Sequence, residues 1–135
     1  MSEKNVFEKI IDGDVSCTKV FEDNTFVAFM DIFPVSFGHI LIIPKEKGYV
    51  WVQDMPDDLA GDIFILAKKL IPSIKKALNC DYVQISISGT DIPHVHIHLI
   101  PRYFDDNLKG FPNLAYENNT HMNNIADSIR NEITE

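Results

Sequence analysis

The chain has 135 residues, of which 45% are hydrophobic, and this is the size and composition of one soluble domain spanning residues 1–135. Its net charge of −8 argues against non-specific binding to DNA or to an anionic membrane. No apolar run reaches the length of a membrane span, residues 1–9 lack the apolar region of a signal peptide, and the two cysteines are isolated. We therefore expect a cytoplasmic protein.

The first part of the chain predicts a short helix followed by three strands. Asn5 is placed to cap a helix that runs to Ile11, and Gly13 is placed to end it. Residues 16–22 and 25–31 have the composition of two strands joined by a turn. Four consecutive aliphatic residues within residues 38–44 predict a buried strand.

A long helix is predicted next. Between Pro56 and Leu78 an apolar residue recurs every three or four positions, which is the spacing of one helix face. Pro72 lies inside this pattern, where it removes a backbone hydrogen bond at a cost of about 3 kcal/mol. We therefore expect the helix to kink or break near Leu70.

The last part of the chain predicts two more strands and a helix. Residues 81–88 alternate between apolar and polar side chains, which is typical of a half-buried strand, and residues 94–100 form a strand closed by Pro101. Residues 103–119 have no regular pattern, and residues 124–133 carry an apolar helical stripe. Because helices and strands do not alternate one for one, we expect an α+β fold with an antiparallel sheet.

Three histidines occupy alternate positions in the last predicted strand. Since side chains of a strand alternate between its two faces, His94, His96 and His98 share one face. Three adjacent imidazoles carry a free-energy cost of desolvation and charge repulsion when more than one is charged, and a stable fold does not require them. A pocket that uses a nucleophile and hydrogen-bond donors at neutral pH does require such a group of imidazoles.

Two kinds of chemistry fit this histidine face. In the first, a neutral imidazole attacks phosphorus. In the second, alternate histidines bind a divalent metal ion, with His39 or Asp31 as a third ligand. Spacing alone does not separate these two possibilities.

Two sequence blocks resemble the histidine triad family. Residues 94–100 match the motif His-φ-His-φ-His-φ-φ, where φ is hydrophobic, and residues 29–45 are similar to the family's first signature block. The resemblance covers about residues 5–103 and leaves residues 104–135 as a C-terminal tail. It implies a HIT-like fold, in which a five-stranded antiparallel sheet carries one long helix and shorter terminal helices, and a homodimer.

The resemblance also implies an activity. Members of the family are nucleotide hydrolases or transferases that attack the α-phosphate through a covalent nucleotidyl-histidine. The implied substrate is a purine nucleotide, either a nucleoside phosphoramidate or a dinucleoside polyphosphate. On the matching positions His96 is the nucleophile, His94 orients it through its carbonyl group, His98 donates to the phosphate or the leaving group, and His39 supports the triad.

The same resemblance implies a set of nucleotide-binding residues. Asp31 would hold the ribose hydroxyls, and the base pocket and phosphate contacts would come from Ile32, Phe7, Ile11, Ser88 and Thr90. Many members hold a structural zinc ion, but the matching positions here are Asn5, Glu8 and Lys47. We therefore expect neither a metal ion nor a cofactor.

The loop before the histidines departs from the family pattern. Residues 89–93 replace a Gly-Gln-Ser/Thr-Val segment, so that Thr90 stands at the glutamine position and Asp91 at the hydroxyl position. A carboxylate near phosphate is unfavourable unless it turns away or is protonated. This leaves an alternative, a purine-nucleotide-binding module with little turnover. A DNA-end deadenylase of the same family is disfavoured by the net charge and by the lack of a basic extension.

Overall fold

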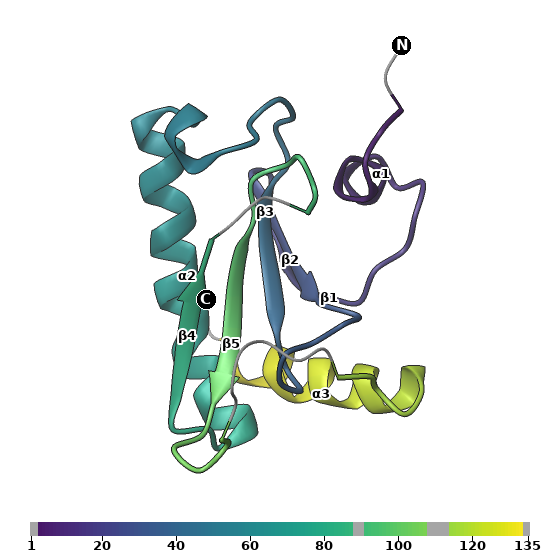
Figure 1. Ribbon diagram of the computed structural model, residues 1–135, viewed down its shortest axis with the longest axis vertical. Helices are drawn as coiled ribbons and strands as arrows, with labels where there is room; N and C mark the ends of the chain where they lie inside the picture. The colour runs from purple at the N-terminus through teal and green to yellow at the C-terminus, as the bar shows by residue number, and fades with distance from the viewer. Residues whose placement is uncertain (1–2, 88–90, 108–113, 134–135) are drawn as a thin grey trace.

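The computed structural model describes residues 3–87, 91–107 and 114–133. Five strands form one antiparallel sheet in the order β1-β2-β3-β5-β4 (Figure 1). The strands are β1 Lys19–Glu22, β2 Phe26–Met30, β3 Ile40–Pro44, β4 Tyr82–Ser86 and β5 Ile97–Arg102. The predicted α+β class and five-stranded antiparallel sheet are confirmed.

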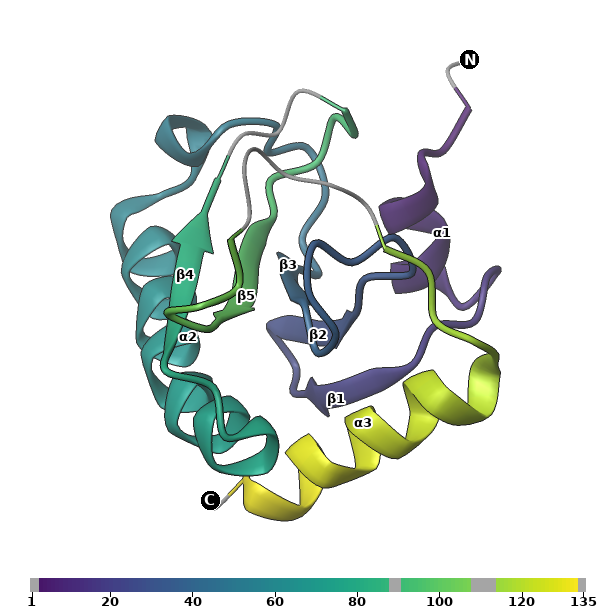
Figure 2. The same ribbon diagram turned by 60° about the horizontal axis from the view of Figure 1, so that its bottom comes forward.

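Helices lie against both faces of this sheet. They are α1 Val6–Asp12, the 3₁₀ turn η1 Val52–Asp54, α2 Asp57–Leu78 and α3 Asn119–Glu132. The long helix α2 packs on one face, and α3 runs beside β1 and the end of α2 (Figure 2). Within the described ranges, none of the helices has both the length and the apolar character that a membrane crossing requires.

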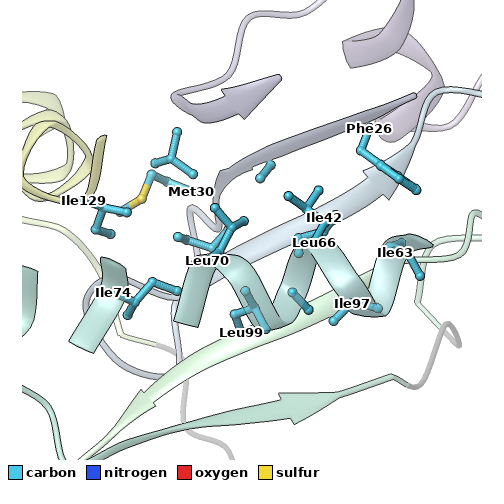
Figure 3. Close-up of a cluster of buried hydrophobic side chains, with 14 of the residues drawn as sticks. Phe26, Met30, Ile42, Ile63, Leu66, Leu70, Ile74, Ile97, Leu99 and Ile129 are labelled. Atoms are coloured by element: carbon cyan, nitrogen blue, oxygen red, sulfur yellow. The ribbon is translucent and has the colours of Figure 1, made fainter. Parts of the chain in front are cut away.

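The larger apolar core lies between α2 and the sheet. Figure 3 shows Ile97 and Leu99 of β5 in this core together with Leu66 and Leu70 of α2, and all four are buried. A smaller core on the opposite face joins α1 to β2 and β3, with Phe7 buried among strand side chains. The face of β5 that is turned away from α2 is therefore the face shared with α1.

Helix α1 has the boundaries that its sequence predicts, within one residue. The side chain of Asn5 accepts a hydrogen bond from the backbone N–H of Glu8, and the carboxylate of Glu8 accepts one from the N–H of Asn5. Gly13 ends the helix in the left-handed conformation, with φ +81°, which favours glycine. These caps satisfy backbone groups that a short helix otherwise leaves unpaired.

Helix α2 is continuous from Asp57 to Leu78, so of the kink or break expected near Leu70 the break is wrong. Pro72 lies inside the helix on its exposed side, while Leu70 and Ile74 on either side of it are buried in the core. Packing of the apolar stripe therefore outweighs the backbone hydrogen bond that proline removes.

Strand β5 starts later and ends later than predicted. His94 and His96 precede it, because the backbone N–H of His94 donates to the carbonyl of Ile92 and that of Val95 to the carbonyl of Tyr49. Pro101 belongs to the strand and does not close it. It pairs only with Val83 of β4, beyond the last pair of β5 with β3, so its missing N–H removes no bond to β3.

The remaining boundaries differ by a few residues. Strands β1, β2, β3 and β4 are all shorter than predicted, and the end of the predicted fourth strand, at Ser88, lies outside the described residues. Helix α3 begins five residues earlier than predicted, because Asn118 caps it by accepting a hydrogen bond from the N–H of His121. Ile85 is 42% exposed although the alternation predicts burial, since β4 is an edge strand of the sheet.

Candidate active site

A pocket of about 760 Å³ opens between α1 and the sheet. Its walls come from α1, from β2 and β3, and from β5 with the segment that precedes it. The histidines in the wall are His39, His96 and His98, and the carboxylates are Asp31 and Asp91. The fold thus gathers side chains from both signature blocks around one cavity.

His96 presents one free ring nitrogen. Its Nδ1–H donates to the carbonyl oxygen of His94 at 2.7 Å, so the neutral ring carries its proton on Nδ1. Nε2 is buried and has no hydrogen-bond partner among the described residues. The rings of His96 and of Phe7 in α1 form a T-shaped contact, with centroids 5.0 Å apart. Nε2 is therefore held in a fixed orientation and is shielded from water.

His94 stands behind His96. It is 1% exposed, and its Nε2–H donates to the carbonyl of Pro44 at the end of β3 at 2.9 Å. Burial lowers its pKa. A neutral His94 is thus anchored to β3, and its own carbonyl fixes the tautomer of His96.

His98 and His39 form a second hydrogen-bonded pair. The Nδ1 of His39 accepts from the backbone N–H of Val35 at 3.0 Å, so its Nε2 carries the proton and donates to Nδ1 of His98 at 2.9 Å. This leaves the Nε2–H of His98 as the donor on the pocket side of the pair.

Both members of this pair are neutral at physiological pH. Burial, with a smaller effect of the neighbouring His98, lowers the pKa of His39 to about 3. Burial and the neighbouring His96 lower the pKa of His98 to about 4. The pair therefore acts through oriented hydrogen bonds and carries no positive charge near neutral pH.

Asp31 lies at the end of β2, next to this pair. Its Oδ1 accepts from the backbone N–H of Phe33 at 2.9 Å, and its Oδ2 lies 3.5 Å from Nε2 of His39. Burial raises its pKa, against the smaller lowering effect of the Phe33 hydrogen bond. Ile32, the next residue, lines the pocket and is 62% exposed.

The predicted nucleotide-binding residues are brought together only in part. Asp31, Ile32 and Phe7 line the pocket. Ile11 does not: it packs beside the smaller core, and Ile10 takes its place in the pocket wall. The cause is the docking angle of α1, which turns positions 7 and 10, three residues apart, towards the cavity. Ser88 and Thr90 lie outside the described residues.

Asp91 was not among the predicted site residues, yet it lies beside the nucleophile candidate. Its Oδ1 is 3.5 Å from Nε2 of His96. The sequence signalled only that a carboxylate replaces a hydroxyl in this loop. The direction in which the Asp91 carboxylate points depends on how the loop returns to β5. Local sequence patterns do not specify this path.

One group of side chains has the composition of a metal site. Among the residues that the structure describes, Asp31, His39 and His98 bring ligand atoms within 4.8 Å of one another. However, both nitrogens of His39 are already used, Nδ1 as an acceptor and Nε2 as a donor. A metal ion on Nε2 would require an imidazolate or the loss of the Val35 hydrogen bond. The group therefore fits a hydrogen-bonded relay better than a metal site.

Comparison with known proteins places the chain in a family. The family model for the HIT domain matches residues 12–105, which is more than half of the chain. The chain therefore belongs to the HIT family. It is 39% identical over 106 residues to a HIT-like protein of Methanocaldococcus jannaschii, covering 75% of this chain and 81% of that protein.

Some of the relatives have names that state an activity. The chain is 37% identical over 99 residues to an adenosine 5′-monophosphoramidase of Schizosaccharomyces pombe, covering 72% of this chain and 73% of that protein. Among solved structures, a HIT-like protein of Bartonella henselae superposes with a TM-score of 0.85 at 28% identity, over 98% of both chains. A HIT family member of Bacillus subtilis gives a TM-score of 0.73 at 30% identity, over 98% of this chain and 99% of that one.

Proposed function

We propose that the protein is a nucleotide hydrolase that cleaves the bond between the α-phosphorus of a purine nucleotide and its leaving group. The observation that carries this proposal is the buried Nε2 of His96, a residue of the pocket wall. This nitrogen has no hydrogen-bond partner among the described residues, and in the neutral ring the bond from Nδ1–H to His94 leaves it without a proton. The similarity to adenosine 5′-monophosphoramidases favours a phosphorus–nitrogen bond. A dinucleoside polyphosphate is the other substrate class that this chemistry accommodates.

The proposed reaction has two steps. First, Nε2 of His96 forms a bond to the α-phosphorus as the bond to the leaving amine breaks, and the departing nitrogen keeps the electron pair and takes up a proton from solvent. Water then attacks the phosphorus, the electron pair returns to Nε2, and the water releases a proton. The nucleoside monophosphate leaves and His96 is regenerated.

The neighbouring groups have positioning and binding roles in this proposal. The carbonyl of His94 holds the tautomer that leaves Nε2 of His96 free. The Nε2–H of His98, held by His39, donates to a phosphate oxygen or to the leaving group. Asp31 accepts hydrogen bonds from the ribose hydroxyls, since a carboxylate can accept from two vicinal hydroxyls.

The apolar part of the pocket fits the purine base. Phe7 and Ile10 form one wall, and Ile32 lies exposed where a base can cover it. We include Phe7 and Ile32 in the proposed base site and replace Ile11 by Ile10. Burial of a flat aromatic base against these side chains supplies affinity without additional charge.

Turnover of adenosine 5′-phosphoramidate tests the proposal directly. The purified protein should release AMP, and His96→Ala should abolish that release. His121→Ala is the matched control, because this histidine lies on α3 against Phe37 and Tyr116, outside the pocket wall. Mass spectrometry of protein quenched during turnover should find an adenylyl group on His96. Equal activity of His96→Ala would overturn the mechanism.

Binding without turnover is the second candidate function. It is favoured by Asp91, whose carboxylate lies 3.5 Å from Nε2 of His96, where it disfavours approach of an anionic phosphate. Calorimetry that shows AMP binding, together with no AMP release from the phosphoramidate, would support this alternative.

A homodimer in the cytoplasm completes the proposal. Among the described strands β4 lies at the edge of the sheet beside β5. It exposes Tyr82 and Ile85, so a second copy can add to this edge. The isolated cysteines, Cys17 and Cys80, suit a reducing compartment. Analytical ultracentrifugation of the wild type and of Ile85→Lys tests the dimer, which the lysine should weaken.

A further inference from the structure

The charge of the pocket is unusual for a site that binds phosphate. Of the described residues in its wall, two are carboxylates, Asp31 and Asp91, and none is lysine or arginine. The histidines His39 and His98 are neutral, since burial lowers the pKa of each well below its ordinary value. A substrate therefore meets negative charge and hydrogen-bond donors, but no fixed positive side chain within this part of the wall.

Two lysines that approach α1, Lys4 and Lys47, are already paired. Lys47 lies 2.6 Å from the carboxylate of Asp12, and Lys4 lies 2.7 Å from the same carboxylate and 3.1 Å from that of Asp14. Neither lysine belongs to the pocket wall. They therefore do not offset Asp31 and Asp91.

Asp91 is placed to act on the reacting groups. Its Oδ1 lies 3.5 Å from Nε2 of His96, and its side chain is 67% exposed, so the carboxylate faces both the nucleophile and the pocket opening. It also raises the pKa of Asp31, although less than burial does. Its field thus reaches across the space that the α-phosphate and its substituent must occupy.

From this arrangement we propose that Asp91 selects substrates by the charge of the leaving group, favouring a cationic amine and rejecting an anionic one. The inference rests on the proposed hydrolase function and specifies its substrate class. A phosphoramidate whose leaving amine bears a second, protonated amine would be preferred. A dinucleoside polyphosphate, whose leaving group carries several negative charges, would be disfavoured.

The reaction geometry supports a role in selection. The leaving group departs on the side of phosphorus opposite to the attacking Nε2. Because Oδ1 of Asp91 lies 3.5 Å from that nitrogen, the leaving group remains within several ångströms of the carboxylate. At about 6 Å and an effective dielectric constant of about 40, one unit of charge changes an equilibrium or a rate about tenfold. A cation and an anion at the same place therefore differ by about a hundredfold.

Three adenosine phosphoramidates of similar size test this inference. Their leaving amines are ethylenediamine, propylamine and glycine, which carry a positive, a neutral and a negative end group. For the wild type, we expect kcat/KM to fall by about tenfold from each substrate to the next. Raising the salt concentration from 0.05 to 0.5 M should reduce both ratios, because salt screens partly exposed charges.

The variants Asp91→Asn and Asp91→Ser separate charge from shape. In both, the ratio of kcat/KM for the ethylenediamine substrate to that for the glycine substrate should fall at least tenfold. The ratio is the readout, so a general change of activity does not affect it. Asp62→Asn is the matched control, because it makes the same charge change on α2, outside this pocket wall, and should keep the wild-type ratio.

The possible outcomes are distinct. Loss of the preference in both Asp91 variants but not in Asp62→Asn supports the inference. Hydrolysis of all three substrates at equal rates, or a preference that persists without Asp91, overturns the inference and leaves the proposed function standing. If the wild type hydrolyses none of the three, the proposed function fails and the inference fails with it.

Discussion

Nε2 of His39 lies 2.9 Å from Nδ1 of His98, and the other nitrogen of His39 accepts from the backbone N–H of Val35, so the proton between the two rings can come only from His39. This direction leaves His98 with a proton on Nε2. A backbone group before β3 thus determines, through two side chains, which nitrogen of His98 carries the proton.

Replacing His39 should therefore affect catalysis through the tautomer of His98. In His39→Leu, His98 loses its partner and populates both tautomers, and we expect kcat to fall roughly tenfold, the value of one hydrogen bond. His39→Gln places an amide donor near the former Nε2 and should recover part of this loss. The measurements are kcat and the ¹⁵N chemical shifts of the His98 ring. Identical tautomer populations in the wild type and His39→Leu would contradict the relay.

The lowered pKa values of the relay also make stability depend on pH. The pKa of His39 is about 3 and that of His98 about 4 in the folded protein, against an ordinary value of 6.5. Between pH 6.5 and about 3 the unfolded chain binds protons at these positions that the folded state excludes. The free energy of unfolding should therefore fall as the pH is lowered through this range.

A comparison of two proteins isolates this effect. Urea unfolding at pH 7 and at pH 5 should show a larger loss of stability for the wild type than for His39→Gln, which lacks one of the two imidazoles of this pair. The raised pKa of Asp31 makes the free energy of unfolding change with pH in the opposite direction, but Asp31 is present in both proteins. An equal loss in both would mean that His39 is not held neutral by the fold.

Metal removal should leave the activity unchanged. A divalent ion on Asp31, His39 and His98 would have to displace the proton shared by the two rings. Because Nδ1 of His39 is occupied by Val35, the fold opposes that exchange. After dialysis against EDTA, the rate of phosphoramidate hydrolysis should equal that of untreated protein. A loss of activity that Zn²⁺ restores would show that the metal interpretation is right.

The sequence predicted the orientation of the histidines better than their secondary structure. Alternation put His96 and His98 on one face and Ile97 and Leu99 on the other, and the apolar pair is indeed in the α2 core. The pattern did not show that His94 and His96 precede the strand. Their backbone conformation depends on hydrogen bonds such as that from Val95 to Tyr49, which is distant in the sequence.

Contacts between distant segments explain the other differences. Pro72 predicts a broken helix by its local effect, but burial of Leu70 and Ile74 keeps α2 continuous. The choice of Ile10 over Ile11 in the pocket follows from how α1 docks on the sheet. The position of Asp91 follows from the path of a loop. Local periodicity contains none of this information.

The glycine before His39 gives a final prediction. Gly38 has φ +95°, which favours glycine, and its N–H donates to the hydroxyl of Tyr116 at 3.0 Å. An added Cβ would overlap Cδ1 of Leu78 and lie 3.3 Å from Cγ of Pro101. Gly38→Ala should therefore lower the free energy of unfolding by about 1–3 kcal/mol, the usual cost of a strained backbone conformation. Urea unfolding measures this change.

Gly61 of α2 provides the matched control for this substitution. A Cβ at Gly61 would meet nothing within 4 Å, and the residue lies on the exposed side of the helix. Gly61→Ala should raise the free energy of unfolding by about 0.5–1 kcal/mol, because alanine loses less backbone entropy than glycine in a helix. Opposite signs for the two substitutions would show that position 38 needs glycine for its conformation. If Gly38→Ala were as stable as the wild type, the turn that delivers His39 to His98 would not depend on this residue.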